Sequence, residues 1–159
     1  MRVVALGWLL AFVLPAARAA ESDSPLAARV ILLANSDDPD SVRIAKHYAE
    51  VRGVPPANLI ALKMPLGESI TWREFVATLW RPLLEQLVSA GWIDAIPMAT
   101  TDAIGRRKYA PNRHRIAALV VCRGVPLKIE HDPALAAEVR PFTARAEFLT
   151  NAGAVDAEF

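Results

Sequence analysis

The only cysteine of the chain, Cys122, is the first residue to consider for chemistry, because it ends the apolar run of VVCRGVPL at 120–127. A cysteine nucleophile needs a base, usually a histidine, within hydrogen-bonding reach. The histidines are His47, His114 and His131, and no known nucleophile signature surrounds any of them. A buried unpaired cysteine behaves as a small apolar residue. We therefore expect Cys122 to have a packing role rather than a catalytic one.

The other metal-binding residue types do not form a recognisable ligand pattern. Three scattered histidines and one cysteine lack the spacing of a zinc site. The acidic segment NSDDPDS at 35–41 lacks the central glycine and the final glutamate of a calcium loop. The sequence therefore predicts no metal site, and it identifies no cofactor.

The loop at 35–40 is the candidate site for a polar ligand. Asp38 directly precedes Pro39, and this order favours Asp38 as a helix cap, whose carboxylate accepts hydrogen bonds from free backbone N–H groups. Asn35 and Asp37 are then not needed by the local structure and can face a ligand. The candidate ligand-binding residues are Asn35, Asp37, Asp38 and Arg123. The alternative is ordinary turn chemistry, in which the arginine pairs with a neighbouring carboxylate.

A basic stretch is the main charge feature of the chain. It contains Arg106, Arg107, Lys108, Arg113 and Arg115. Such groups bind phosphate, acidic polysaccharide or lipid headgroups, so an anionic or polysaccharide ligand is the candidate partner here. The alternative is a solvated loop, which the near-neutral charge of the chain favours.

Apolar strands and amphipathic helices alternate around these residues. Strands are expected at 29–34, 58–63 and 116–121, because their apolar runs lack polar alternation, as is typical of strands covered on both faces. One helix is expected from Pro39 until Gly53 stops it.

A second helix is expected to start at a capping box formed by Thr71 and Glu74, and to kink or break near Pro82. A short fourth strand is expected at 125–129. Residues 92–115 are the least regular part of the pattern.

This order predicts an α/β fold with three layers. The first strand, helix and second strand have the length of a right-handed βαβ unit. We expect a mostly parallel sheet in the order 2-1-3 with helices on both faces, incomplete at the C-terminus. Ligands of open parallel sheets bind at the carboxyl ends of the strands, where the strand order reverses. This rule brings the loop at 35–40 and the turn at 122–124 together.

The N-terminal residues 1–19 have the features of a signal peptide. Arg2 precedes an apolar run at 3–14 that is too short to span a bilayer, and Ala17-Arg18-Ala19 resembles a cleavage site. An uncleaved anchor is the alternative. We expect a linker at 20–27, an α/β domain at 28–159, and export to the periplasm or beyond, with no membrane span after cleavage.

Export changes the charge and redox expectations. Removing Arg2 and Arg18 leaves 16 basic against 17 acidic residues, so the mature charge is −1 and does not suggest nucleic acid as a partner. A single cysteine forms no internal disulfide, so packing must stabilise the fold.

Four segments carry a resemblance to a known family. They are VILLANSDDPDSVRIAKHYAEVRGVPPANLIAL, ESITWREF, ALVVCRGVPLKI and AVDAEF. Together they resemble a family of uncharacterised exported bacterial proteins that occur in species with the exosortase system for PEP-CTERM proteins. The resemblance implies an extracytoplasmic location and no established activity. It also implies that this chain corresponds to an N-terminal part of such a protein.

Two functional hypotheses follow. The first is a cell-envelope or periplasmic domain that binds a polar ligand or a partner at the carboxyl ends of its strands. The second is a hydrolase of caspase-like cysteine peptidase architecture, with its catalytic residues further downstream; this second hypothesis depends on fold analogy alone.

Overall fold

The computed structural model describes residues 25–135 and 150–159, and the expected signal peptide and most of the expected linker lie outside them. Three strands form a parallel sheet in the order β2-β1-β6: β1 (Val30–Asn35), β2 (Leu59–Leu62) and β6 (Ala118–Val121). The pairing confirms the α/β class and the expected order 2-1-3, since Leu32 lies opposite Leu59 on one side and Val120 on the other. Short 3₁₀ helices, Leu26–Arg29 and Pro56–Asn58, lead into β1 and β2.

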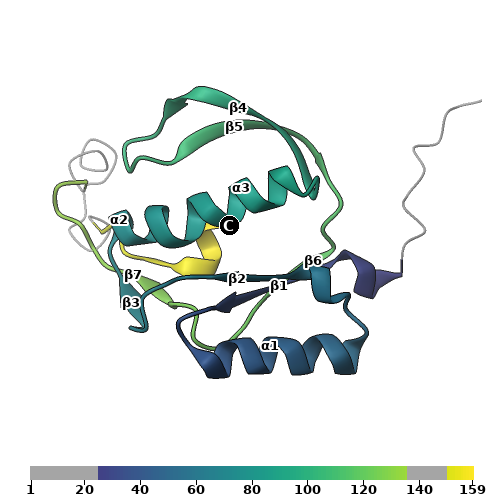
Figure 1. The fold of residues 1–159 in the computed structure, drawn as a ribbon. Coiled ribbons are helices and arrows are strands. Elements are labelled where there is room, and N and C mark those ends of the chain that lie inside the picture. The colour runs from purple at the N-terminus through teal and green to yellow at the C-terminus, as the bar shows by residue number, and fades with distance from the viewer. Residues whose placement is uncertain (1–24, 136–149) are drawn as a thin grey trace, which may run out of the picture.

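Helix α1 (Pro39–Arg52) covers one face of this sheet (Figure 1). The Asp38 carboxylate accepts a hydrogen bond from the Asp40 N–H at 3.0 Å, and Gly53 ends the helix with a left-handed φ of 66°, as the sequence predicts. The small side chains of Ala45 and Ala49 let the helix lie close to Leu32 and Ala34.

The second helical segment also packs against the parallel sheet. It begins at the predicted Thr71–Glu74 capping box with α2 (Trp72–Glu74), continues as a π-helix (Phe75–Trp80), and ends as α3 (Arg81–Ser89). The wide π-turns precede Pro82, where a regular α-turn would press the proline ring against the carbonyl four residues earlier. Leu79, Leu83 and Leu87 join Ile31 and Leu33 in the largest apolar cluster.

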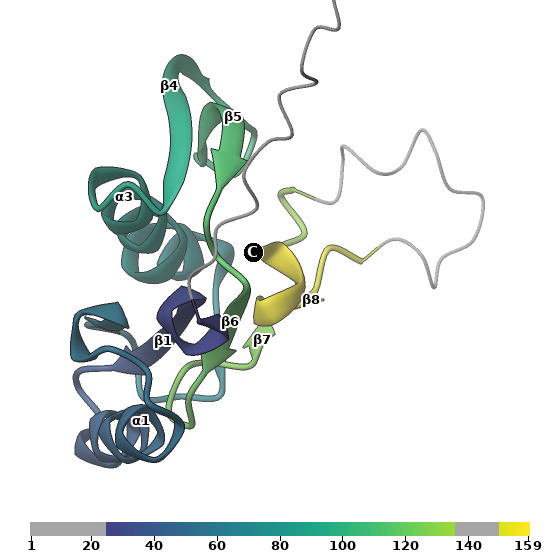
Figure 2. The same cartoon turned by 90° about the vertical axis from the view of Figure 1, so that its right-hand side faces the viewer.

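Residues 92–115, expected to be irregular, instead form an antiparallel hairpin of β4 (Ile93–Thr101) and β5 (Arg107–His114). The hairpin lies over α3 on the side away from the parallel sheet (Figures 1 and 2). Two prolines, two register shifts and mostly exposed side chains remove the alternation by which a sequence normally reveals a strand.

A third, small sheet contains β3 (Ser69–Ile70), β7 (Lys128–Ile129) and β8 (Gly153–Ala154) in the order β3-β7-β8. The expected fourth strand therefore exists only as β7 and does not extend the parallel sheet. A 3₁₀ helix, Val155–Glu158, follows β8 and places Val155 in the main core. Among the residues described, no helix is long and apolar enough to cross a membrane.

Candidate functional site

The loops after β1 and β6 meet, as the strand order predicts, and Asn35 is the residue that joins them. Its side chain is 0% exposed. Its amide nitrogen donates to the carbonyl oxygens of Met64, Pro65 and Gly124 at 3.2, 3.2 and 2.9 Å. Its oxygen accepts from the N–H groups of Asp37 and Met64. The expectation that Asn35 is not needed by the local structure is therefore wrong, because its side chain fastens three loops together.

Gly124 closes the crevice in which a ligand was expected between β1 and β6. It has a φ of 90°, and a Cβ at this position would clash with the Asp38 carboxylate and contact Ser41. The Ser41 hydroxyl in turn accepts a hydrogen bond from the Asn35 N–H at 2.9 Å. The backbone of the β6 loop thus packs directly onto the start of α1, and Asp38 is used as a cap.

Asp37 and Arg123, the remaining two candidates, lie on opposite sides of this closed junction. Asp37 lies 3.8 Å from the Lys63 ammonium, beside a cavity of about 500 Å³ at the end of β2. The Arg123 guanidinium is 72% exposed and lies 3.5 Å from Asp40. It borders a second cavity, of about 620 Å³, at the end of β6.

The 620 Å³ cavity, called the β6-end cavity below, combines one cation and one carboxylate with an apolar floor. Its other lining residues are Leu119, Val121, Cys122, Pro126, Leu127, Val155 and Asp156. Figure 2 shows the 3₁₀ helix at Val155–Glu158 beside β7 and near the end of β6. The sequence does not reveal this cavity, because the residues that enclose it come from two segments, 119–127 and 155–156, that are distant in the chain.

Cys122 has the environment of a packing residue. It is buried in a cluster with Ala34 and Ala45, and burial raises the pKa of its thiol. Two of the candidate bases are engaged elsewhere, because His114 contacts the Ile116 carbonyl and His131 accepts from the Asn151 N–H, and the third, His47, is exposed on α1. In the part of the chain that is described, no three histidine, cysteine, aspartate or glutamate side chains are grouped to hold a metal ion.

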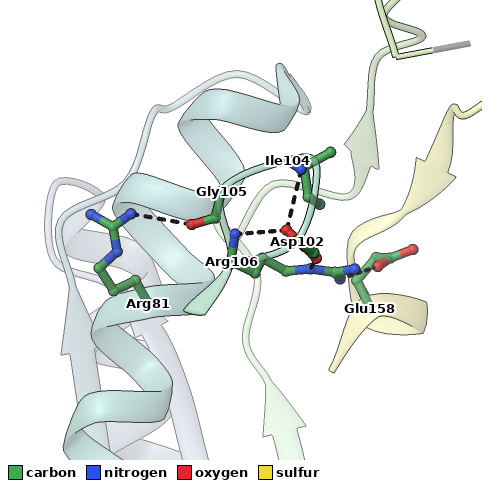
Figure 3. Close-up of polar contacts among 6 residues, drawn as sticks. All are labelled: Arg81, Asp102, Ile104, Gly105, Arg106 and Glu158. Atoms are coloured by element: carbon green, nitrogen blue, oxygen red, sulfur yellow. Dashed lines mark hydrogen bonds and ion pairs between the residues drawn. The ribbon is translucent and has the colours of Figure 1, made fainter. Parts of the chain in front are cut away.

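Arg106, the first residue of the basic stretch, is held by two carboxylates (Figure 3). Its guanidinium contacts Asp102 and Glu158 at 2.7 Å each. Burial lowers the pKa of Arg106, but the hydrogen bonds that its guanidinium donates to Asp102 and Glu158, together with the attraction of their charges, outweigh this and raise the pKa. This ion-pair triad fastens the tip of the hairpin to the last residues of the chain.

The other basic residues do not converge on one point. Arg115 donates to the Gly91 carbonyl and lies over the Trp92 ring at 5.2 Å, and Arg113 pairs with Asp94 at 3.4 Å. Arg107 donates to the Met98 carbonyl, and Lys108 is exposed. The five residues of the predicted anion site therefore do not act as one cluster, and Arg106 is already neutralised.

A groove of about 410 Å³ lies between the hairpin and α3 and was not foreseen from the sequence. Trp80 and Leu84, one helical turn apart, form one wall, and Tyr109 belongs to the other. The signal for it is the spacing of Trp80, Leu84 and Val88, which gives α3 a second apolar stripe beside its leucine face.

No family model matches the chain, and no curated protein or solved structure is similar to it. The chemistry of its own residues therefore carries the functional proposal.

Proposed function

We propose that the protein is an exported binding domain that holds a polar ligand, or a polar group of a partner, in the β6-end cavity. The observation that carries the proposal is the exposed Arg123 guanidinium beside a cavity of about 620 Å³ at the carboxyl end of a parallel strand. Pockets of this size, apolar with a few convergent polar groups, are the usual form of a small-molecule site.

The chemistry of the lining indicates the kind of ligand. Arg123 supplies a planar cation suited to a carboxylate or a phosphate, and its 3.5 Å contact with Asp40 is long enough to be exchanged for a ligand. Leu119, Val121 and Val155 supply the apolar floor. Asp156 adds a carboxylate to the lining, so we favour a small polar molecule that carries both an anionic group and a hydrogen-bond donor, together with an apolar portion.

Binding is favoured over hydrolysis because of the state of Cys122. A catalytic thiol needs a lowered pKa and a base, whereas burial raises the pKa of this thiol and its neighbours are alanines. A hydrolase would have to use residues other than those at this junction.

The finer features expected from the sequence belong to the same proposal. We infer a three-layer arrangement, supported by the packing of Leu32 and Ala34 toward α1 and of Ile31 and Leu33 toward the α3 side. We also propose a cleaved signal peptide at 1–19, a periplasmic or extracellular location, and membership of the exosortase-associated exported family.

The test is a thermal-shift screen of the mature protein with a panel of sugar acids, amino acids and small dicarboxylates. We expect Arg123→Ala to abolish the stabilisation by any hit. Arg43→Ala is the matched control, because Arg43 also pairs with Asp40, at 3.0 Å, but does not line the cavity. Equal shifts in both variants would contradict the proposal.

A further inference from the structure

The groove beneath the β4–β5 hairpin combines an apolar wall with a cationic end. Trp80 at the end of the π-helix and Leu84 of α3 face β5 across it. Tyr109 and Pro111 line the β5 side, and Met98 of β4 lines the groove while remaining 42% exposed. The rings of Trp80 and Tyr109 are 6.3 Å apart and inclined by 58°, so they form a wall rather than a closed stack. Apolar surface of this extent gains free energy when a ligand removes it from water.

The lining of the groove contains more basic than acidic side chains. Its acidic side chain, Asp102, is already bound by Arg106 at 2.7 Å. Arg107 and Lys108 also line the groove, and neither forms an ion pair with any of the described residues. Within the lining Asp102 and Arg106 cancel, and Glu158, the second carboxylate on Arg106, lies outside it, so Arg107 and Lys108 are the cations that face a ligand.

The strand register separates the apolar part of the groove from its cationic part. Thr101 pairs with Arg107 near the tip of the hairpin, whereas Ile93 pairs with His114 at its base. The basic side chains therefore lie toward the tip, and Ile93, Ala95 and Pro111 lie toward the base. A ligand that follows the groove meets cations at one end and apolar side chains along the rest.

We propose that this groove binds an anionic amphiphile with a single acyl chain. The chain lies between Trp80, Leu84 and Tyr109, and the headgroup lies beside Arg107 and Lys108. The volume of about 410 Å³ falls within the range of roughly 300–1,000 Å³ that ligand pockets occupy. This site is separate from the β6-end cavity, since the two share no lining residue.

The probe is monomeric dodecanoate, titrated into the mature protein by calorimetry below its micelle concentration. We expect saturable binding that strengthens about fourfold for each methylene between octanoate and dodecanoate, because each carbon buries further apolar surface. Dodecanol, which lacks the charge, should bind at least fivefold more weakly than dodecanoate.

Two matched pairs of variants locate the ligand. Lys108→Glu should weaken dodecanoate binding at least tenfold, whereas Arg113→Glu, on the same strand but outside the groove, should not. Ala95→Phe fills the groove and should abolish binding, whereas Ala110→Phe, an exposed position of the same hairpin, should not. Arg123→Ala should leave binding unchanged, so failure of this proposal and failure of the proposed function are distinguishable.

Three results would overturn the inference. The first is no saturable binding, and the second is affinity that does not depend on chain length. The third is a protein that cosediments with phosphatidylglycerol vesicles but does not bind monomeric dodecanoate, which would assign the hairpin to a membrane surface instead. Ala95→Phe could fail to fold, and the Lys108→Glu and Arg113→Glu pair then still decides the question.

Discussion

At the scale of single residues, the side chain of Asn35 links three loops through five hydrogen bonds. One buried side chain satisfies two N–H groups and contacts three carbonyl oxygens from the loops after β2 and β6. An asparagine suits this position because it both donates and accepts, whereas an aspartate would bring its charge against three carbonyls. The residue therefore fixes the end of the sheet.

We expect Asn35→Ala to lower the free energy of unfolding by about 3 kcal/mol, because it leaves buried polar groups without partners. Asp37→Ala is the control: its side chain is exposed and paired only at 3.8 Å, so the change should cost no more than about 0.5 kcal/mol. Chemical denaturation of both variants measures the difference. Equal losses would show that the network does not depend on Asn35.

Cys122 allows a prediction about pH. Because burial raises the pKa of the thiol in the folded state, the folded protein holds this proton more tightly than the unfolded chain does. Stability from this group is complete below the unfolded pKa of cysteine and falls as the pH rises through the folded pKa. We expect slow alkylation by iodoacetamide at pH 8, compared with fast alkylation in denaturant. Fast alkylation of the native protein would indicate an activated thiol.

At the scale of elements, the turn after β6 is shaped by its contact with the start of α1. Gly124 is required there for two reasons, its positive φ and its closeness to Asp38. Gly105 has almost the same φ, 86°, but a Cβ added there meets nothing within 4 Å. Substitutions at the two glycines therefore distinguish the cost of backbone strain, present at both, from the cost of steric contact, present only at Gly124.

We predict that Gly105→Ala costs about 1 kcal/mol of stability, from the backbone conformation alone. Gly124→Ala should cost at least about 1 kcal/mol more, because the new methyl group must displace the Asp38 carboxylate or the loop. Thermal unfolding of the two variants gives the comparison. Similar losses would mean that the loop moves away without cost.

The triad of Asp102, Arg106 and Glu158 joins elements that are distant in the sequence. Glu158→Gln should lower stability by about 1 kcal/mol at low ionic strength and by less in high salt, since the pair is partly exposed and screened. Glu130→Gln, an exposed acid without an ion pair among the described residues, should have no measurable effect. A salt-independent loss for Glu158→Gln would argue for packing rather than charge.

Sequence patterns predicted the parallel strands, α1 and its two caps, because each depends on local residues or on an unbroken apolar run. They did not predict the hairpin, because its prolines and exposed side chains remove the alternation of apolar and polar residues that indicates a strand. They brought Asn35, Asp38 and Gly124 into one neighbourhood but misassigned Asn35, because its partners at Met64, Pro65 and Gly124 are set by tertiary contacts that no local pattern contains.

At the scale of the whole molecule, α3 lies between two β-structures, the parallel sheet beneath it and the hairpin above (Figure 1). Its Leu83 and Leu87 join the core with the sheet, whereas Leu84, with Trp80 from the preceding π-helix, faces the hairpin. The two proposed sites lie on different elements, one at the end of β6 and the other under the hairpin. They share no lining residue, but the ion pair of Arg106 with Glu158 links the groove to the 3₁₀ helix that lines the β6-end cavity.

The expected export of the molecule is tested on the protein as the cell makes it. We predict that the protein isolated from the cell envelope begins at Ala20, after the Ala17-Arg18-Ala19 site, and that Ala19→Asp prevents this cut. N-terminal sequencing of both proteins decides the point. A cytoplasmic protein that begins at Met1 would contradict the location and the redox expectation together.

The two edges of β1 are expected to pair at different times during folding. Its partner on one side, β2, follows after one helix, whereas Val30 pairs with Ala118 on the other side, 88 positions later in the chain. The entropy of closing the longer loop makes the second pairing the slower one. The β1–α1–β2 unit can therefore assemble as a nucleus before β6 has paired with the other, apolar edge of β1. During that interval the edge is open to pairing with another chain, which makes the late arrival of β6 the step at which aggregation competes with folding.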